Sequence, residues 1–234
     1  MRVPSRRIET LAQVPLFQSL GVDEISRLDT QCSWRSVPSQ EWIIDYQDQT
    51  DDVVFVVKGT VRVKIQSVTG RDVLLREISE GEFFGELAAI DGQPRSSGIV
   101  AVTDVVVAHM PKSVFRSAVH SNPDVCDQLL AILAGQIRML ANRVNESSTL
   151  DIRHRLYAEL LRMARSAPGH GNRMVISPPP FHADMASRVG ARREAVSREI
   201  KALERSGLIV RRRGALELID PEAIRKMIES ASFE

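Results

Sequence analysis

The chain has 234 residues, of which 43% are hydrophobic and 26% are charged. These fractions are those of an ordinary globular protein, and the length favours two modest domains. No apolar run approaches the length of a membrane span, and no apolar segment follows the basic residues 1–7, as a secretory signal would require. We therefore expect no membrane partner and a cytoplasmic location.

Cysteine and histidine usage argues against a metal centre. Cys32 and Cys126 are the two cysteines, fewer than an all-cysteine iron–sulfur cluster needs, and we expect both to be reduced and mostly buried. The five histidines show no helical zinc pair. They are His109, His120, His154, His170 and His182. No metal is expected, and a haem ligand among the histidines is the alternative.

The net charge of +1 hides an asymmetry along the chain. Residues 41–92 contain eleven acidic and five basic side chains, whereas residues 188–213 contain nine basic and three acidic ones. A basic C-terminal segment suggests contact with a polyanion, although a solvated basic face would have the same composition.

The N-terminal half changes from helical to strand periodicity. Apolar residues at near-helical spacing predict short helices within residues 5–30. Val61, Val63 and Ile65 then alternate with polar residues, and residues 69–70 join this strand to another at 72–78 as a hairpin. Residues 53–57 and 105–107 are apolar enough to be buried strands. Many short strands between glycines predict a β-sandwich or β-roll.

After Pro123 the spacing of apolar residues becomes helical again. Five residues follow a 3, 4, 3, 4 spacing, which is the a/d seam of a two-stranded coiled coil. This seam consists of Leu130, Leu133, Ile137, Leu140 and Val144. A single amphipathic helix on a core is the alternative. The seam fades at residues 146–148, where we expect a hinge near 145–149, and a further helix spans about 151–164.

The segment 182–205 predicts a helix-turn-helix. Residues 182–189 form a short helix, Gly190 supplies a left-handed turn, and residues 192–205 form a second helix. The inward residues of the two helices are Met185, Ala186, Val189, Val196, Ile200 and Leu203. Residues 208–210 and 216–218 predict a β-hairpin beside these helices, which makes the motif winged.

The outer face of the second helix carries side chains suited to base edges. Arg193 and Arg198 can donate to guanine, Glu194 can accept from cytosine, and Ser197 lies between them. Phosphate contacts are expected from Arg192, Arg188, His182 and Arg213. The motif predicts binding to double-stranded DNA, and a protein-docking module is the alternative.

Together these segments resemble the cyclic-AMP receptor protein (CRP/FNR) family of bacterial transcription regulators. The resemblance rests on residues 81–88 followed by Arg95-Ser96-Ser97, which are similar to the phosphate-binding cassette of the family, and on residues 193–198. It implies an α+β fold with a cyclic-nucleotide-binding β-roll (1–122), a dimerisation helix and hinge (123–148), and a winged helix-turn-helix (149–234). It also implies a homodimer that reads a palindromic operator and recruits RNA polymerase, and it implies no enzymatic activity.

The residue types of the cassette suit a cyclic nucleotide. Arg95 can pair with the phosphate, Ser96 adds a hydroxyl and an amide, Glu86 can accept from the ribose hydroxyl, and Gly85 lets the backbone approach. The ligand-binding set implied by the resemblance is Phe84, Gly85, Glu86, Leu87, Ala88, Arg95, Ser96, Ser97, Val63, Leu75, Leu140, Ala141 and Asn142. A structural loop in which Arg95 merely pairs with Glu86 is the alternative.

The sequence departs from the family at the base-recognition positions. Leu140 and Ala141 stand where cyclic-AMP receptors carry a polar pair, and Asn142 offers the nearest amide. Cyclic AMP is favoured by the family, while a hydroxyl at Ser97 leaves cyclic GMP or a dual specificity open. A haem-bound gas, another effector, or no effector at all are the remaining alternatives.

Overall fold

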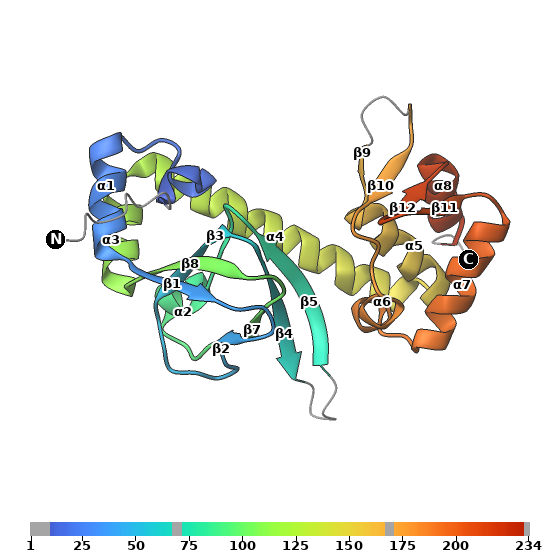
Figure 1. Ribbon diagram of the computed structural model, residues 1–234, viewed down its shortest axis with the longest axis horizontal. Helices are drawn as coiled ribbons and strands as arrows, with labels where there is room; N and C mark the ends of the chain where they lie inside the picture. The colour runs from blue at the N-terminus through green and yellow to red at the C-terminus, as the bar shows by residue number, and fades with distance from the viewer. Residues whose placement is uncertain (1–9, 67–71, 167–170, 232–234) are drawn as a thin grey trace. The chain divides into compact units, whose positions relative to one another are not determined.

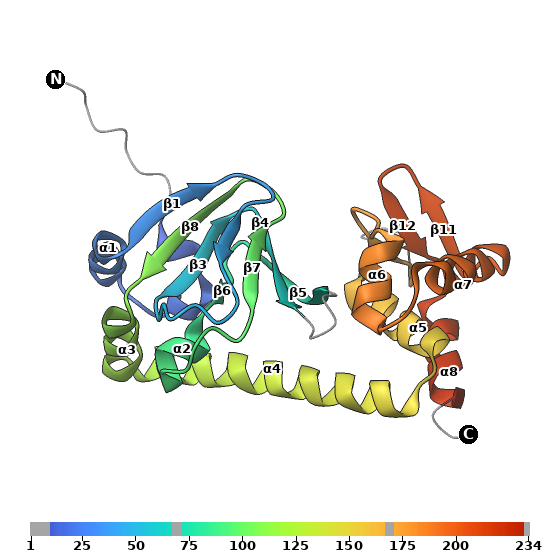
Figure 2. The ribbon, with the colours of Figure 1, turned by 90° about the horizontal axis from the view of Figure 1, so that it is seen from below.

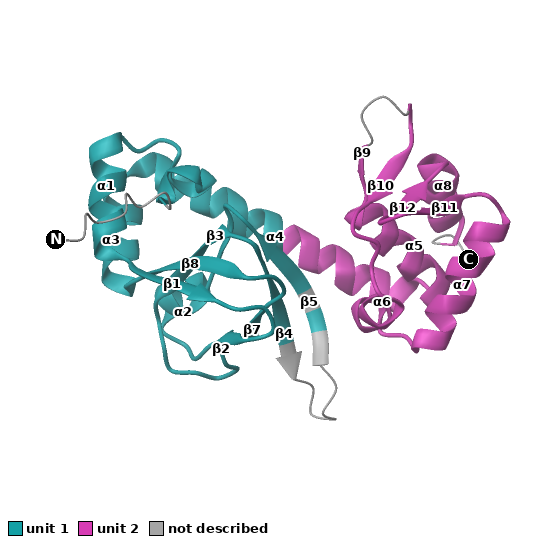
Figure 3. Ribbon diagram, in the orientation of Figure 1, with its two compact units in different colours: residues 1–136 teal, residues 137–234 magenta. Residues whose placement is uncertain are grey.

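A computed structural model describes residues 10–66, 72–166 and 171–231. The chain divides into two compact units, Met1–Gln136 and Ile137–Glu234 (Figure 3). The boundary falls inside the long helix α4 (Pro123–Thr149), so this helix belongs partly to each unit. The three-part division expected from the sequence, with bounds at residues 122 and 148, stays a prediction.

Unit 1 is built on two four-stranded antiparallel sheets (Figures 1 and 2). One sheet has the strand order β1-β8-β3-β6, and the other has the order β2-β7-β4-β5. The strands are β1 (Ser33–Val37), β2 (Trp42–Ile44), β3 (Val53–Lys58), β4 (Thr60–Gln66), β5 (Asp72–Ser79), β6 (Phe83–Phe84), β7 (Gly98–Ala101) and β8 (Val105–Met110). The predicted β-roll is confirmed. The expected hairpin turn at residues 69–70 lies outside the described residues.

Helices accompany the sheets of unit 1. The expected helical segment at residues 5–30 contains η1 (Leu11–Gln13), η2 (Pro15–Phe17) and α1 (Val22–Gln31), and its residues 5–9 lie outside the described part. The sequence pattern did not predict α2 (Glu86–Asp91) or α3 (Lys112–Ser121). α2 is too short for a helical period to show, and only Asn122 separates α3 from α4, so the two patterns merge.

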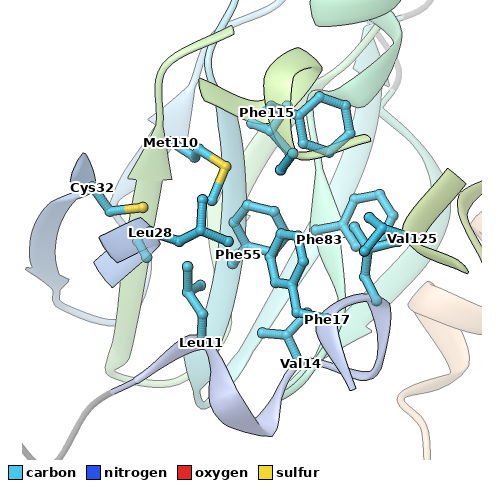
Figure 4. Close-up of a cluster of buried hydrophobic side chains, with 14 of the residues drawn as sticks. Leu11, Val14, Phe17, Leu28, Cys32, Phe55, Phe83, Met110, Phe115 and Val125 are labelled. Atoms are coloured by element: carbon cyan, nitrogen blue, oxygen red, sulfur yellow. The ribbon is translucent and has the colours of Figure 1, made fainter. Parts of the chain in front are cut away.

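Two hydrophobic clusters fix the position of the short strand β6. Phe83 packs in the cluster shown in Figure 4, where its ring centroid lies 5.6 Å from that of Phe55. Phe84 belongs to the other cluster, together with Val54 and Val56. Successive strand residues point to opposite faces, so both faces of β6 are anchored. The turn that follows at Gly85 is thereby held in place.

α4 carries the predicted seam as exposed apolar residues. Leu130, Ile137, Leu140 and Val144 are 49–66% exposed in the single chain. Leu133 differs, because it is partly buried against the first cluster of unit 1. The helix continues through residues 145–149, and Leu150 and Asp151 are the first residues outside it. The expected hinge therefore stays a prediction.

Unit 2 contains the predicted winged helix-turn-helix. Its helices after α4 are α5 (Ile152–Met163), α6 (His182–Val189), α7 (Arg193–Arg205) and α8 (Pro221–Ala231). Its antiparallel sheet has the order β11-β12-β10-β9, with β9 (Arg165–Ser166), β10 (Met174–Ile176), β11 (Ile209–Arg212) and β12 (Ala215–Leu218). Gly190 has a φ of 65° between α6 and α7, as its predicted turn requires. The sequence pattern did not predict α8, whose Ile224 is fully buried.

Two further features concern the described residues of both units. None of the helices in residues 10–66, 72–166 and 171–231 is long and apolar enough to cross a membrane. Within the same ranges, no group of three His, Cys, Asp or Glu side chains is arranged to hold a metal ion.

Candidate ligand site and nucleic-acid interface

Arg95 is a buried cation enclosed by the segment that precedes β3. Its side chain is 3% exposed. Nη2 donates to Asp52 Oδ1 at 2.7 Å and to the Asp52 carbonyl at 2.8 Å, and Nε donates to Thr50 Oγ1 at 3.0 Å. The backbone N–H of Arg95 also donates to the Asp48 carbonyl at 3.0 Å. Side chain and backbone are therefore both fixed by residues 48–52.

Gly85 is required by the position of Arg95. Nη1 of Arg95 donates to the Gly85 carbonyl at 3.0 Å. A Cβ at Gly85 would clash with the Arg95 guanidinium and lie 2.9 Å from the Asp52 carbonyl, and the φ of 85° is one that side chains disfavour. The absence of a side chain at Gly85 thus lets the arginine lie against the turn at which α2 begins.

Asp52 links Arg95 to His109 on β8. Its Oδ2 lies 2.5 Å from His109 Nδ1, while Oδ1 contacts the arginine. Burial acts to raise the pKa of Asp52, but the hydrogen bond to His109 and the electrostatic interactions with His109 and Arg95 outweigh it, so this pKa lies below its usual value. Arg95 therefore pairs with an ionised Asp52, and not with Glu86 as the structural-loop alternative supposes.

Glu86 is the other acidic side chain of the cassette, and it is only 5% exposed. Burial raises the pKa of Glu86, and the charges of Arg76 and Arg95 act in the opposite direction. A buried carboxyl beside the start of α2 is placed to accept from a ligand hydroxyl only if the ligand reaches into the fold. Its contact with a ribose stays a prediction.

The remaining predicted ligand residues differ in accessibility. Phe84, Ala88 and Val63 are buried, Ser97 is half-buried, and Leu87 and Ser96 are exposed. Leu140, Ala141 and Asn142 are exposed on the part of α4 that belongs to unit 2. The side chain of Leu75 lies outside the described residues. None of these assignments is tested by the fold, and they stay predictions.

Sequence reasoning missed three residues of this site: Thr50, Asp52 and His109. Asp52 belongs to an acidic run that has no periodicity, and 43 positions separate it from Arg95. His109 lies 57 positions from Asp52. The adjacent carboxyls at residues 51 and 52, directly before a buried strand, were the one available signal of a buried counter-charge.

The predicted base-reading side chains lie on the exposed face of α7. Arg193, Glu194 and Arg198 are exposed in the N-terminal half of this helix, and Arg192 precedes it as the N-cap residue. Ser197 is half-buried, and its Oγ lies 2.7 Å from His182 Nδ1. Val196, Ile200 and Leu203 anchor the opposite face. The helix therefore has the amphipathic geometry that a recognition helix requires.

His182 and Arg213 are placed at the edges of this surface. His182 Nε2 lies 3.2 Å from Arg211 Nη2. Burial and the charges of Arg211 and Arg193 lower the pKa of His182, which favours the neutral imidazole. Arg213 is exposed in the turn between β11 and β12, followed by Gly214 with a φ of 77°. Both remain predicted phosphate contacts.

Arg188 is a correction to the predicted DNA-binding set. Its side chain is 7% exposed, and Nη1 donates to Glu159 Oε1 at 3.3 Å. Glu159 also pairs with Arg162 on α5 and lies 3.5 Å from Arg143 on α4. Because its guanidinium is buried and engaged by Glu159, Arg188 is part of the interior of unit 2 and not of a surface open to DNA.

Both halves of the chain match known protein families. Residues 34–122 match the cyclic nucleotide-binding domain family, and residues 154–227 match the Crp-like helix-turn-helix domain family. The chain is 30% identical over 183 residues to the cAMP-activated global transcriptional regulator CRP of Escherichia coli O6:H1, a match that covers 77% of this chain and 86% of that protein.

Two further relatives extend the match. The CRP-like cAMP-activated global transcriptional regulator of Mycobacterium tuberculosis is 26% identical over 202 residues, which cover 86% of this chain and 90% of the relative. The crystal structure of a CRP/FNR-family transcriptional regulator from Thermus thermophilus has a TM-score of 0.65 at 26% identity and covers 85% of this chain and 100% of its own. This chain is therefore a member of the CRP/FNR family: a DNA-binding transcription regulator, and not an enzyme.

Proposed function

We propose that the chain is a homodimeric regulator that binds a cyclic nucleotide and then a palindromic operator. Cyclic AMP is the first candidate for this nucleotide. The observation that carries this proposal is the cassette geometry: a buried arginine lies directly against the Gly85 turn, within the segment that matches the cyclic nucleotide-binding domain family. An arginine so placed can recognise a phosphodiester by paired N–H bonds.

The exposed apolar residues of α4 support the homodimer. Leu130, Ile137, Leu140 and Val144 keep heptad spacing and are 49–66% exposed. Four such residues along one helix are more than a monomer's surface usually carries in one stripe, and a second copy of the same helix would cover them with matching knobs and holes. Two copies would present two α7 helices to successive major grooves, about 34 Å apart.

Cyclic AMP is the proposed effector because the relatives described above are named as cAMP-activated. Leu140 and Ala141 offer no polar group to the base, so we assign base recognition to Asn142 of α4 and to the half-buried Ser97. Cyclic GMP is the second ligand to test, since a hydroxyl at Ser97 suits a guanine amino group. A Soret band in the absorbance spectrum would instead favour a haem effector.

The proposed switch is a shift between two arrangements of the dimer. The effector must bind the DNA-competent arrangement more tightly than the other for DNA affinity to rise. RNA polymerase is the proposed partner of the DNA-bound form. Footprinting with and without cyclic AMP tests the switch, and equal protection of the operator in both would contradict it.

Calorimetry on an arginine variant tests the ligand site. Arg95→Gln removes the cation and should weaken cyclic AMP binding roughly a hundredfold, since two charge-assisted hydrogen bonds are lost. Arg27→Gln is the matched control, because Arg27 is 75% exposed and pairs only loosely with Glu24 at 3.9 Å. Thermal unfolding shows whether each variant is folded. Unchanged binding by folded Arg95→Gln would refute the site.

A further inference from the structure

Arg95, the arginine proposed to bind phosphate, is already paired with an anionic side chain of the protein. Each nitrogen of the Arg95 guanidinium donates to a protein oxygen: Nε to Thr50, Nη1 to Gly85, and Nη2 to both the carbonyl and the carboxylate of Asp52. The paired N–H edge that a phosphate would use is therefore engaged by oxygens of the protein itself.

Of the groups that accept hydrogen bonds from the Arg95 side chain, Asp52 is the one that a bound phosphate would repel most strongly. Among the described residues that accept from the guanidinium, Asp52 alone contributes a carboxylate, whereas Thr50 contributes a hydroxyl and Gly85 a carbonyl. A phosphodiester brings a second negative charge to the same guanidinium. Repulsion between two anions a few ångströms apart is substantial where solvent is partly excluded, so the phosphate and the Asp52 carboxylate compete.

The surroundings of Asp52 allow it to release the arginine. Its side chain is 26% exposed, and its Oδ2 lies 2.5 Å from His109 Nδ1. When Oδ1 loses Arg95, the carboxylate keeps the histidine and its access to solvent. It is not left as an unpaired buried charge, which would be costly. His109 is therefore a positioning residue that holds Asp52 in either state.

We infer that Asp52 is an internal counter-anion that competes with the effector phosphate for Arg95 and thereby lowers the effector affinity of this chain. The inference rests on the proposed function, because it needs a phosphodiester at Arg95. Without effector, Asp52 neutralises a cation that would otherwise be buried alone. With effector, the phosphate takes over that role.

Isothermal titration with cyclic AMP and cyclic GMP tests the inference on the full-length protein. Asp52→Asn keeps the size of the side chain and one oxygen for Arg95, but removes the charge. We expect it to bind the nucleotide roughly tenfold more tightly than the unaltered chain. Asp23→Asn is the matched control: this carboxylate is exposed on α1 and should change the affinity by less than about twofold.

A second variant protects the test against misfolding. Asp52→Ser also lacks the charge and is smaller, so it should tighten binding in the same direction, and thermal unfolding of both variants reports their folding. If Asp52 only orients Arg95, both folded variants bind more weakly, and the inference is overturned while nucleotide binding stands. If the unaltered chain and both folded variants bind neither nucleotide, the proposed function itself fails. Tighter binding by the Asp52 variants, or binding by them alone, supports both.

Discussion

Arg193, Arg198 and Arg213 are exposed on unit 2, whereas Arg188 is buried against Glu159. All four lie within one basic segment of the sequence, and composition alone gives them the same role. Their partners separate them: a guanidinium in solvent is available to DNA, and a guanidinium paired inside the fold stabilises the fold. Among the exposed ones, we predict base contacts for the arginines on α7 and a phosphate contact for the arginine on the wing.

We expect substitutions of Arg198 and of Arg213 to have different effects on DNA binding. Arg198→Ala should cost about 1–3 kcal/mol on an operator identified by footprinting and should relax specificity at one G·C pair. Arg213→Ala should weaken binding to all sequences alike and lower the slope of log affinity against log salt by about one. Fluorescence anisotropy over an operator panel and a salt series measures both. The same profile for the two variants would show that the roles are misassigned.

Helices α4, α5 and α6 are joined by a cluster of charged side chains. Glu159 of α5 is 3% exposed and contacts Arg143 of α4 and Arg188 of α6. Arg162 of α5 binds Glu146 of α4 through both carboxylate oxygens at 2.7 Å. One buried carboxylate thus serves arginines from three helices. The cluster fixes the end of the proposed dimerisation helix to the first helix of the helix-turn-helix.

Removing the charge of Glu159 tests this cluster. Glu159→Gln leaves its arginine partners without their shared anion and should lower the free energy of unfolding of unit 2 by about 3 kcal/mol. Glu229→Gln, an exposed position on α8, is the control and should change it by less than about 0.5 kcal/mol. Chemical denaturation followed by circular dichroism gives both values. If the two variants proved equally stable, the cluster would not contribute to the stability of unit 2.

At the level of the whole molecule, α4 is the helix that both compact units share. A regulator that reads a palindrome needs two reading heads, and the exposed seam of α4 supplies a surface for pairing two chains. Binding of one half-site alone gives much weaker affinity than simultaneous binding of two. DNA affinity should therefore depend on dimerisation.

A charge in the seam should separate the dimer. Ile137 is 66% exposed in the single chain, and Ile137→Glu would place two like charges at the helix interface. We expect a monomer in analytical ultracentrifugation and a loss of operator affinity of at least about a hundredfold. Ala131→Glu adds the same charge to an exposed residue of α4 outside the seam and should remain dimeric. A dimer in both variants would place the interface elsewhere.

Elements whose signals are local were predictable from the amino-acid pattern. Helical periodicity and Gly190 defined the helix-turn-helix, heptad spacing defined the stripe on α4, and strand alternation defined the β-roll. The cassette motif identified Arg95 and Gly85 as neighbours in function. These patterns are readable because backbone hydrogen bonding and turn chemistry act between residues close in the chain.

Long-range packing determines which charged groups pair. Asp52 is brought to Arg95 across 43 positions, and Glu159 is brought to Arg188 across 29. It also turned Leu133 toward the core of unit 1 while the other seam residues stayed exposed. Ion pairing and burial depend on long-range packing. A single sequence does not show which distant residue a charged or apolar side chain will contact. For that reason the exposed face of α7 was predictable, and the anionic side chain that pairs with Arg95 was not.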